Sequence, residues 1–320
     1  MTSSMPEMRT VTQQEFGGQD VLSLVNRPRP VPLPTEVLVR VNAAGVNPVD
    51  WKVREGHLAS LVLGRPPFVL GWDVAGVVEE VGFGVTTLAV GDRVFGMPWF
   101  PREAAGYSDY VTAPSRQLAR TPANLSDVQA AAVPLAALTA WQVLVDTLDV
   151  QPGDRVLITA AAGGVGHFAI QFARHLGAHV IATASTANHE WLRELGASEV
   201  VDYHDPDYLS RVKDVDSVVD LAGGDELRLA TVLSPRGSYA AVPAGLPAEL
   251  ATAAEKAGFR ATGFLVEPDG AALTRIAELL ANGTIRVEVA RTFPLAEVAA
   301  AHALGETNRT RGKIVLELNA

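Results

Sequence analysis

The chain has 320 residues, of which 48% are hydrophobic, with a formal net charge of -10, seven histidines and no cysteine. This length suits two domains of roughly 150 residues each. The acidic balance argues against a surface for nucleic acid or anionic membranes, and the lack of cysteine excludes disulfides and cysteine-ligated zinc. Residues 1–10 lack the apolar core of a signal peptide, and no run of ~20 apolar residues predicts a membrane span, so we expect a soluble cytoplasmic protein.

The N-terminal part of the chain predicts an irregular domain of short strands. Strand-forming runs at 36–41, 74–81 and 93–95 alternate with turn signals such as Gly84. Helical periodicity is limited to a stretch near 48–56. These features indicate a β-barrel-like domain and do not by themselves indicate a function.

The clearest local signal is a strand, a glycine turn and a helix at 155–177. The apolar run 155–160 predicts a buried strand, and residues 165–176 carry apolar side chains at helical spacing. Between them, Gly163-Gly164-Val165-Gly166 resembles a dinucleotide-binding turn whose first glycine is replaced by alanine. Gly163 would let the backbone approach a pyrophosphate, and Gly166 would let helix and strand pack closely. The alternative is a tight strand-to-helix turn without a ligand.

After this turn, strands and helices alternate. Strands are predicted at 178–183, 199–202, 217–221 and 238–242, and helices at 187–195, 208–212 and 226–233. Further on, helices are predicted at 271–282 and 296–304 and a strand at 313–318. The alternation predicts an α/β fold with a doubly wound parallel sheet.

Several motifs, in this order along the chain, resemble the medium-chain dehydrogenase/reductase superfamily. They lie at 44–56, 71–82, 91–96, 131–141 and 311–316. The resemblance implies a GroES-like catalytic domain at 1–122, completed by about 268–320, and a Rossmann NADP-binding domain at 123–267.

The zinc ligands of that superfamily are missing. Its zinc alcohol dehydrogenases carry a cysteine and a histidine where this chain has Asn47 and Trp72, and of that ligand set only Asp73 remains. The seven histidines are scattered and form no metal-binding spacing. The chain therefore resembles the zinc-independent quinone oxidoreductase branch, and we expect no metal.

Three residues are candidates for catalysis by this resemblance. It implies that Asn47, Lys52 and Thr139 lie near the nicotinamide; Lys52 stands where a tyrosine often occurs. The alternative for Lys52 is a solvated loop lysine, and that for Thr139 is a hydroxyl bonded to its own helix. We expect Asp73 to be a buried hydrogen-bonding residue rather than a catalytic acid.

The expected cofactor is NADPH. An NAD-specific fold usually carries an acid after its second strand, and here none occurs until Glu190. Ser185 and Thr186 offer hydroxyls, and the resemblance implies that His189 and Tyr203 lie near the 2′-phosphate; the alternative for His189 is a solvated helix residue. Because histidine is mostly neutral at pH 7, we expect a modest preference for NADPH that grows toward pH ~6. The full set of expected cofactor contacts is Asn47, Thr139, Gly163, Gly164, Val165, Gly166, Ser185, Thr186, His189, Tyr203, Ala222, Val242 and Phe264.

The predicted function is an NADPH-dependent oxidoreductase that transfers a hydride to a quinone or an α,β-unsaturated carbonyl without a metal. The alternative is a nucleotide-binding structural or redox-sensing protein with little turnover. The resemblance also implies a homodimer that pairs through edge strands near residues 238–267.

Overall fold

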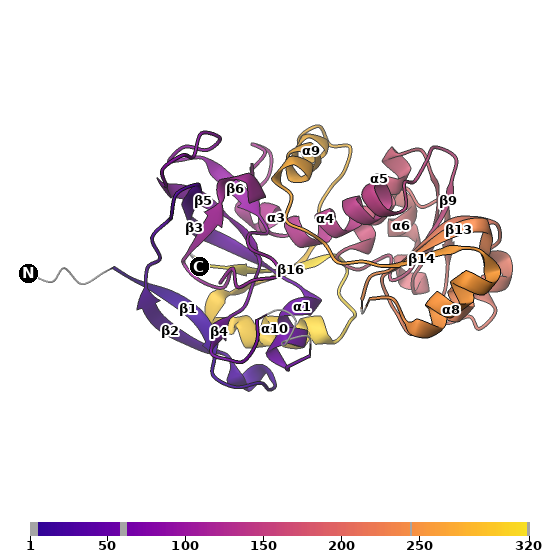
Figure 1. Cartoon of the computed structure of the whole chain (residues 1–320), viewed down its shortest axis with the longest axis horizontal. Helices are drawn as coiled ribbons and strands as arrows, with labels where there is room; N and C mark the ends of the chain where they lie inside the picture. Colours follow the sequence, from indigo (N-terminus) through magenta and orange to yellow (C-terminus); the bar gives the residue numbers. More distant parts are fainter. Residues whose placement is uncertain (1–5, 58–62, 244, 319–320) are drawn as a thin grey trace, which may run out of the picture. The chain divides into compact units, whose positions relative to one another are not determined.

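The computed structural model describes residues 6–57, 63–243 and 245–318. The chain forms two compact units (Figure 1). Unit 1 contains Met1–Leu138, Glu267–Gly283 and Val287–Ala320; unit 2 contains Thr139–Val266 and Thr284–Arg286. The boundary expected from the sequence, between residues 122 and 123, lies earlier than this division. None of the described helices is long and apolar enough to cross a membrane.

The larger sheet of unit 1 is built around β3 (Glu36–Val46), which is buried along most of its length. It pairs antiparallel with β5 (Asp73–Val81), β7 (Tyr110–Pro114) and β16 (Lys313–Glu317). The remaining strands are β6 (Arg93–Gly96), β8 (Leu118–Arg120) and β15 (Val289–Pro294). Where β3 and β5 meet, a Cβ on Gly76 would lie 2.0 Å from the Arg40 carbonyl oxygen, so this close approach requires glycine.

A second, three-stranded sheet and several helices complete unit 1. The small sheet has the order β2 (Ser23–Pro28), β1 (Glu7–Gln13), β4 (Phe68–Val69). The helices are α1 (Pro48–Arg54), α3 (Asp127–Ala131), α9 (Gly270–Ala281) and α10 (Val298–Glu306). Ser126 caps α3, as the sequence predicts: its hydroxyl accepts the backbone N–H of Gln129.

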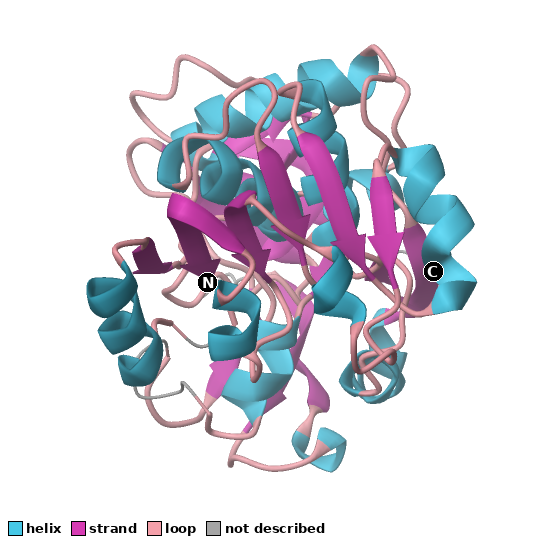
Figure 2. Ribbon diagram, turned by 90° about the vertical axis from the view of Figure 1, so that its right-hand side faces the viewer, coloured by secondary structure: helices cyan, strands magenta, loops and turns pink. Residues whose placement is uncertain are grey.

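Unit 2 is a doubly wound parallel sheet with helices packed on it, as the sequence predicts (Figure 2). Its strand order is β11 (Glu199–Val201), β10 (His179–Thr183), β9 (Arg155–Ile158), β12 (Val215–Asp220), β13 (Leu233–Ala241), β14 (Arg260–Gly263). The helices are α4 (Pro134–Gln142), which begins in unit 1, α5 (Gly166–His175), α6 (His189–Leu195), α7 (Glu226–Ala230) and α8 (Ala248–Ala257). The chain reverses its winding between β9 and β12, and folds of this kind bind ligands at that reversal.

Two predicted helices of unit 2 are shorter in the structure. Residues 208–212 form one 3₁₀ turn, Tyr208–Arg211, and α7 ends at Ala230 because β13 begins at Leu233. Most apolar side chains of both segments pack in the core cluster around Val218 and Tyr239, whereas Leu227 is exposed. Burial against the sheet therefore decides where these two helical segments end. The spacing of apolar residues over only five to eight positions does not determine those ends.

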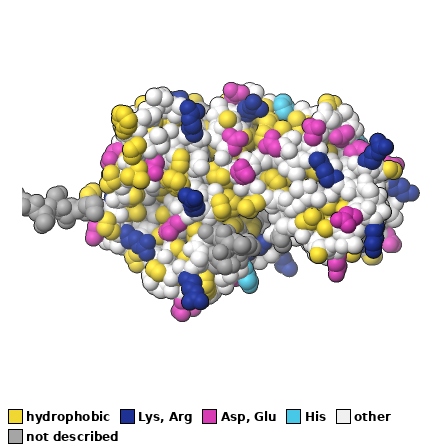
Figure 3. Space-filling model, in the orientation of Figure 1, with side chains coloured by type: hydrophobic (Ala, Val, Ile, Leu, Met, Phe, Trp, Pro, Cys, Tyr) yellow, Lys and Arg dark blue, Asp and Glu magenta, His cyan; other side chains and the backbone are white. Residues whose placement is uncertain are grey.

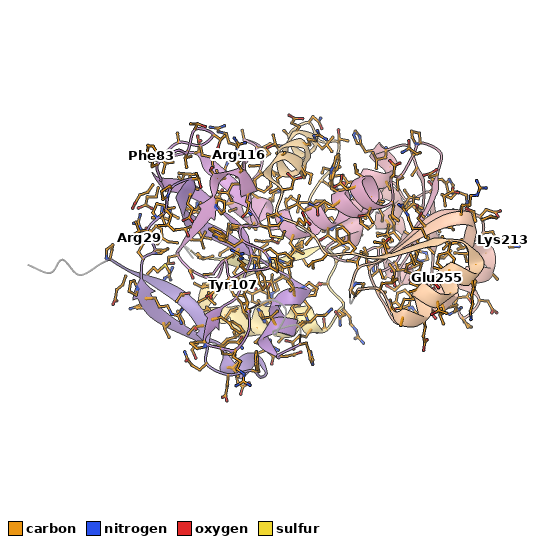
Figure 4. All side chains as sticks on the ribbon, in the orientation of Figure 1. Arg29, Phe83, Tyr107, Arg116, Lys213 and Glu255 are labelled. Atoms are coloured by element: carbon orange, nitrogen blue, oxygen red, sulfur yellow. The ribbon has the colours of Figure 1, made fainter. Side chains whose placement is uncertain are left out.

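The molecular surface carries charges of both signs. On the face seen in Figure 3, acidic and basic side chains are interspersed. Arg29, labelled in Figure 4, bridges Glu79 and Glu80 at 2.9 Å each and lies over the ring of Tyr110. Ion pairs this close to solvent contribute little to stability, so the buried charges matter more.

Candidate functional site

The carboxyl ends of the six strands of unit 2 form one edge, because all of these strands are parallel. Most of the expected cofactor-binding residues directly follow these strand ends. Gly163, Gly164, Val165 and Gly166 follow β9, Ser185, Thr186 and His189 follow β10, Tyr203 follows β11, Ala222 follows β12, Val242 follows β13 and Phe264 follows β14. The tertiary structure thus brings these residues to the ligand-binding edge of a doubly wound sheet.

The glycine turn after β9 fits a pyrophosphate. A Cβ on Gly166 would lie 2.6 Å from the carbonyl oxygen of Ala160 and from Cα of Ala161, so close packing of α5 on β9 requires this glycine. A Cβ on Gly163 would meet only the Ala160 carbonyl oxygen, at 3.2 Å. Within the described part of the chain, the N–H groups of Gly164, Val165 and Gly166 have no carbonyl acceptor. These amides, at the positive end of the α5 dipole, match the needs of a phosphate.

A buried carboxylate fixes the backbone after β12. Asp220 is fully buried; it accepts the hydroxyl of Thr159 at 2.7 Å and that of Tyr239 at 2.8 Å. The Thr159 oxygen in turn accepts the N–H groups of Leu221 and Ala222. Burial and the neighbouring Asp220 raise the pKa of Tyr239, which keeps its hydroxyl protonated as a donor. The backbone at Ala222 is therefore held rigidly at the point where the sheet reverses its winding.

An acid lies among the residues expected near a 2′-phosphate. Asp202 directly follows β11, and its carboxylate accepts the backbone N–H of Thr186 at 3.2 Å and the hydroxyl at 2.5 Å. Its other oxygen accepts the backbone N–H of His204 at 2.9 Å and lies 2.8 Å from the His204 ring. The hydroxyl of Thr186 and these further hydrogen bonds hold the pKa of Asp202 well below its usual range. Tyr203 is 51% exposed beside it.

The other two candidates at this end also have partners. The Ser185 hydroxyl accepts from the side-chain amide of Asn188 at 3.1 Å. The His189 Nε2 lies 3.2 Å from the Ala184 carbonyl oxygen. The strand ends β10 and β11 thus gather Ser185, Thr186, His189 and Tyr203, but around a carboxylate.

In unit 1, Asn47 belongs to a buried polar cluster. It caps α1, and its side-chain amide donates to Asp73 at 2.9 Å, while its carbonyl oxygen accepts from Lys313. Lys313 also lies 3.5 Å from Asp73, whose second oxygen accepts the N–H of Leu135 at 2.8 Å. Burial raises the pKa of Asp73 and lowers that of Lys313, and each charge opposes the shift of the other. Asp73 is confirmed as a buried hydrogen-bonding residue.

The cluster continues from Asn47 through α1 to α10. Asp50 accepts the N–H of Asn47 at 2.7 Å and the hydroxyl of Tyr107 at 2.8 Å. The Tyr107 hydroxyl lies 3.3 Å from His302 Nε2, and His302 Nδ1 lies 3.1 Å from the fully buried guanidinium of Arg54. Tyr107 is labelled inside unit 1 in Figure 4. Burial raises the pKa of Asp50 to about 7, and burial together with Arg54 lowers that of His302 to about 3.

The other two candidate catalytic residues, Lys52 and Thr139, belong to different units. Lys52 is half-buried in α1, and Thr139 is buried in α4 as part of unit 2. Trp72, at the position of a zinc-binding histidine, is buried; its indole N–H donates to the Arg102 carbonyl at 2.7 Å and its ring packs edge-on against Phe100. An indole N–H is a donor only and does not ligate a metal. No group of three or more His, Asp or Glu side chains suited to a metal occurs among the residues that the structure describes.

Comparison with known proteins agrees with these observations. Residues 33–123 match the family model of the alcohol dehydrogenase GroES-like domain, and residues 195–316 match one described as zinc-binding dehydrogenase. A 2-haloacrylate reductase from a Burkholderia species is 38% identical over 89% of this chain and 91% of its own length. The chain belongs to the medium-chain dehydrogenase/reductase superfamily, in its quinone oxidoreductase branch.

Two further members of the superfamily are similar over nearly the whole chain. The structure of the quinone oxidoreductase from Coxiella burnetii has a TM-score of 0.91 and 37% identity, covering 98% of this chain and all of the other. A chloroplastic NADPH-dependent alkenal/one oxidoreductase from Arabidopsis thaliana is 34% identical over 98% of this chain and 81% of its own. Both similarities agree with a chain built from a GroES-like domain and a Rossmann domain.

Two residues of these sites, Lys313 and Asp202, were not predicted from the sequence. Lys313 stands at the start of an apolar strand, where a lone lysine is a signal of a buried partner. Asp202 directly follows the strand β11, so a search for acids at every strand end, rather than only after the second strand, would have found it.

Proposed function

We propose that this chain is an NADPH-dependent oxidoreductase that reduces quinones or α,β-unsaturated carbonyl compounds without a metal. The observation that carries the proposal is the strand-end edge of unit 2. There the glycine turn presents amides with no carbonyl acceptor among the described residues, and the expected cofactor contacts follow successive strands. Relatives named quinone oxidoreductase, alkenal/one oxidoreductase and haloacrylate reductase support the acceptor class.

Unit 2 is the nucleotide-binding part in this proposal, and unit 1 the catalytic part. The amides of the glycine turn bind the pyrophosphate, and the Asp220–Thr159 pair orients the backbone at Ala222. NADPH, when bound, supplies the hydride. The family resemblance implies that Lys52 and, from unit 2, the Thr139 hydroxyl lie near the nicotinamide, and we assign them to positioning and to stabilising negative charge on the acceptor oxygen.

The acceptor class follows from the electrostatics of a site without a Lewis acid. A quinone or enone spreads the negative charge that develops during hydride addition, whereas an unactivated carbonyl concentrates it on one oxygen. In this chain Trp72 lacks a ligating lone pair, and both oxygens of Asp73 already accept hydrogen bonds from Asn47 and Leu135. The charge must therefore be stabilised by hydrogen-bond donors and by the acceptor itself.

Oxidation of NADPH at 340 nm tests the proposal, with 1,4-benzoquinone, 9,10-phenanthrenequinone and short enones or enals as acceptors. We expect turnover with at least one of these classes and none with saturated ketones. The same rates are expected after exhaustive chelation and dialysis, with no stoichiometric zinc in the purified protein. Tight NADPH binding without turnover on any acceptor would favour a structural or redox-sensing role instead, and zinc lost together with activity would contradict the metal-free mechanism.

The proposed assembly is a homodimer. β14 is an edge strand of the unit 2 sheet, and Leu265, just beyond it, is 66% exposed. An edge strand with free N–H and C=O groups next to an exposed apolar side chain is suited to pairing with a second copy. Sedimentation equilibrium at micromolar concentration should show a dimer, and Leu265→Asp should shift it toward monomer. The cytoplasmic location stays a prediction from the sequence.

A further inference from the structure

The structure brings a carboxylate to the place where the sequence predicts donors for a 2′-phosphate. β10 and β11 pair in parallel, with Thr183 opposite Val201, so the residues that follow them lie side by side. Asp202 thereby reaches Thr186, from which it is separated by 16 positions in the chain, and takes both its N–H and its hydroxyl. The hydroxyl that was expected to donate to a phosphate donates to Asp202 instead.

The charge balance at these two strand ends is unfavourable for a phosphate. Residues 184–190 and 199–207 contain no lysine or arginine. The histidines there are already engaged, His204 with Asp202 and His189 with the Ala184 carbonyl oxygen. Asp205, the next acid along the chain, is neutralised by Arg211, whereas His204 is the only possible cation paired with Asp202 among the residues that the structure describes. Because its pKa lies well below the usual range, Asp202 stays ionised throughout the neutral pH range.

We propose that Asp202 is a specificity-determining residue that lowers the preference of this chain for NADPH over NADH. The inference rests on the proposed function, since it takes the strand-end edge of unit 2 as the nucleotide site. The carboxylate repels a 2′-phosphate and competes with it for Thr186. The same carboxylate is an acceptor for a ribose 2′-hydroxyl, which is the role of the acid in NAD-binding members of this fold. The chain therefore accepts both cofactors.

The test compares Asp202→Asn with the wild-type chain. Asparagine is isosteric, and its carbonyl oxygen still accepts from Thr186. Its NH2 group replaces the oxygen that accepts the His204 N–H, so the charge is removed together with that one hydrogen bond. Asp207→Asn is the matched control, because it removes the same charge from an exposed position in the same loop. Asp202→Ser is a second variant, and the melting temperature reports whether each variant is folded.

The first readout is binding of two fragments by titration calorimetry: 2′,5′-ADP and 5′-AMP, which differ only in the 2′-phosphate. We expect the ratio of their affinities to shift toward 2′,5′-ADP by about tenfold in Asp202→Asn, and the shift to shrink at high salt. We expect no shift in Asp207→Asn. The ratio of kcat/KM for NADPH to that for NADH should move in the same direction.

An unchanged affinity ratio would overturn the inference. Weaker binding of 2′,5′-ADP to Asp202→Asn would also overturn it and would show that Asp202 positions Thr186 for the phosphate. Equal shifts in Asp202→Asn and Asp207→Asn would reduce it to a general charge effect and also overturn it. If the wild-type chain binds neither fragment, the nucleotide site itself is wrong. A shifted ratio without any quinone or enone reduction would leave the inference standing and contradict the proposed function.

Discussion

Two polar regions of the molecule differ in how far their hydrogen bonds are satisfied inside the fold. In unit 1, Asn47, Asp73 and Lys313 are buried and bond mainly to one another. At the strand-end edge of unit 2, the amides of the glycine turn have no carbonyl acceptor in the described part of the chain, and Asp202 and Tyr203 reach solvent. A group with all its bonds satisfied inside the fold contributes to stability, whereas an unsatisfied donor at an edge is available to a ligand.

This contrast changes the expectation for Asn47. Its motif position indicates a residue beside the nicotinamide, yet both ends of its amide are engaged with Asp73 and Lys313. Removing that amide would take one buried hydrogen bond from each of these two charges, so Asn47→Ala should destabilise unit 1 as well as lower turnover. A catalytic role for Asn47 must therefore be read from rates per folded molecule.

The largest expected effect on stability comes from breaking the buried ion pair between Lys313 and Asp73. Lys313→Met removes the cation 3.5 Å from Asp73 and leaves an uncompensated carboxylate in the core of unit 1. We expect a loss of about 3–5 kcal/mol in the free energy of unfolding, measured by urea denaturation. The double variant Asp73→Asn, Lys313→Met should recover part of the loss, and a loss under about 1 kcal/mol in the single variant would show that the pair is not structural.

The glycine turn offers a matched pair of variants that separate packing from binding. Gly166→Ala places a Cβ 2.6 Å from backbone atoms and should cost about 1–3 kcal/mol in stability. Gly163→Ala meets a single carbonyl oxygen at 3.2 Å, so its stability should change by less than about 1 kcal/mol while NADPH affinity falls at least about tenfold. Calorimetry and thermal melting distinguish the two. Normal NADPH affinity in a folded Gly163→Ala would contradict the pyrophosphate site.

Two buried groups of unit 1, His302 and Asp50, should make the stability of the fold depend on pH in opposite directions. The pKa of His302 is about 3 in the fold, below its ordinary 6.5, so the stability it provides is present above pH 6.5 and is lost as the pH falls toward 3. The pKa of Asp50 is about 7, above its ordinary 3.8, so it reduces stability as the pH rises from 3.8 to 7.

Melting temperatures measured from pH 4 to 8 check both directions. Relative to His302→Gln, the wild-type chain should lose stability on acidification below pH 6.5. Relative to Asp50→Asn, it should lose stability as the pH rises from 4 to 7. His57→Gln is the matched control, because that histidine side chain is 74% exposed, and its profile should follow the wild type. Parallel profiles for all four proteins would mean that neither buried group titrates as described.

The smallest effect on stability is expected for Lys52. Because its side chain is half-buried on a short helix, Lys52→Ala should leave the melting temperature within a few degrees. If it stabilises charge on the acceptor, kcat should fall by about a hundredfold. Lys256→Ala, an exposed lysine in α8, is the control and should change neither. Unchanged kcat in Lys52→Ala would show that Lys52 does not stabilise charge on the acceptor.

The sequence by itself determined the doubly wound sheet, the glycine turn and the helix cap at Ser126. These features depend on local properties: the spacing of apolar residues, the missing Cβ of Gly166 and a hydroxyl three residues before the amide that donates to it. Only the tertiary structure decided which charges meet. Lys313 reaches Asn47 across 266 positions because β16 pairs with β3, and Asp202 reaches Thr186 because β11 pairs with β10. Strand pairing between distant segments is not encoded in local periodicity. Because the polar groups that pairing brings together are buried, their pKa values shift and they form hydrogen bonds with one another.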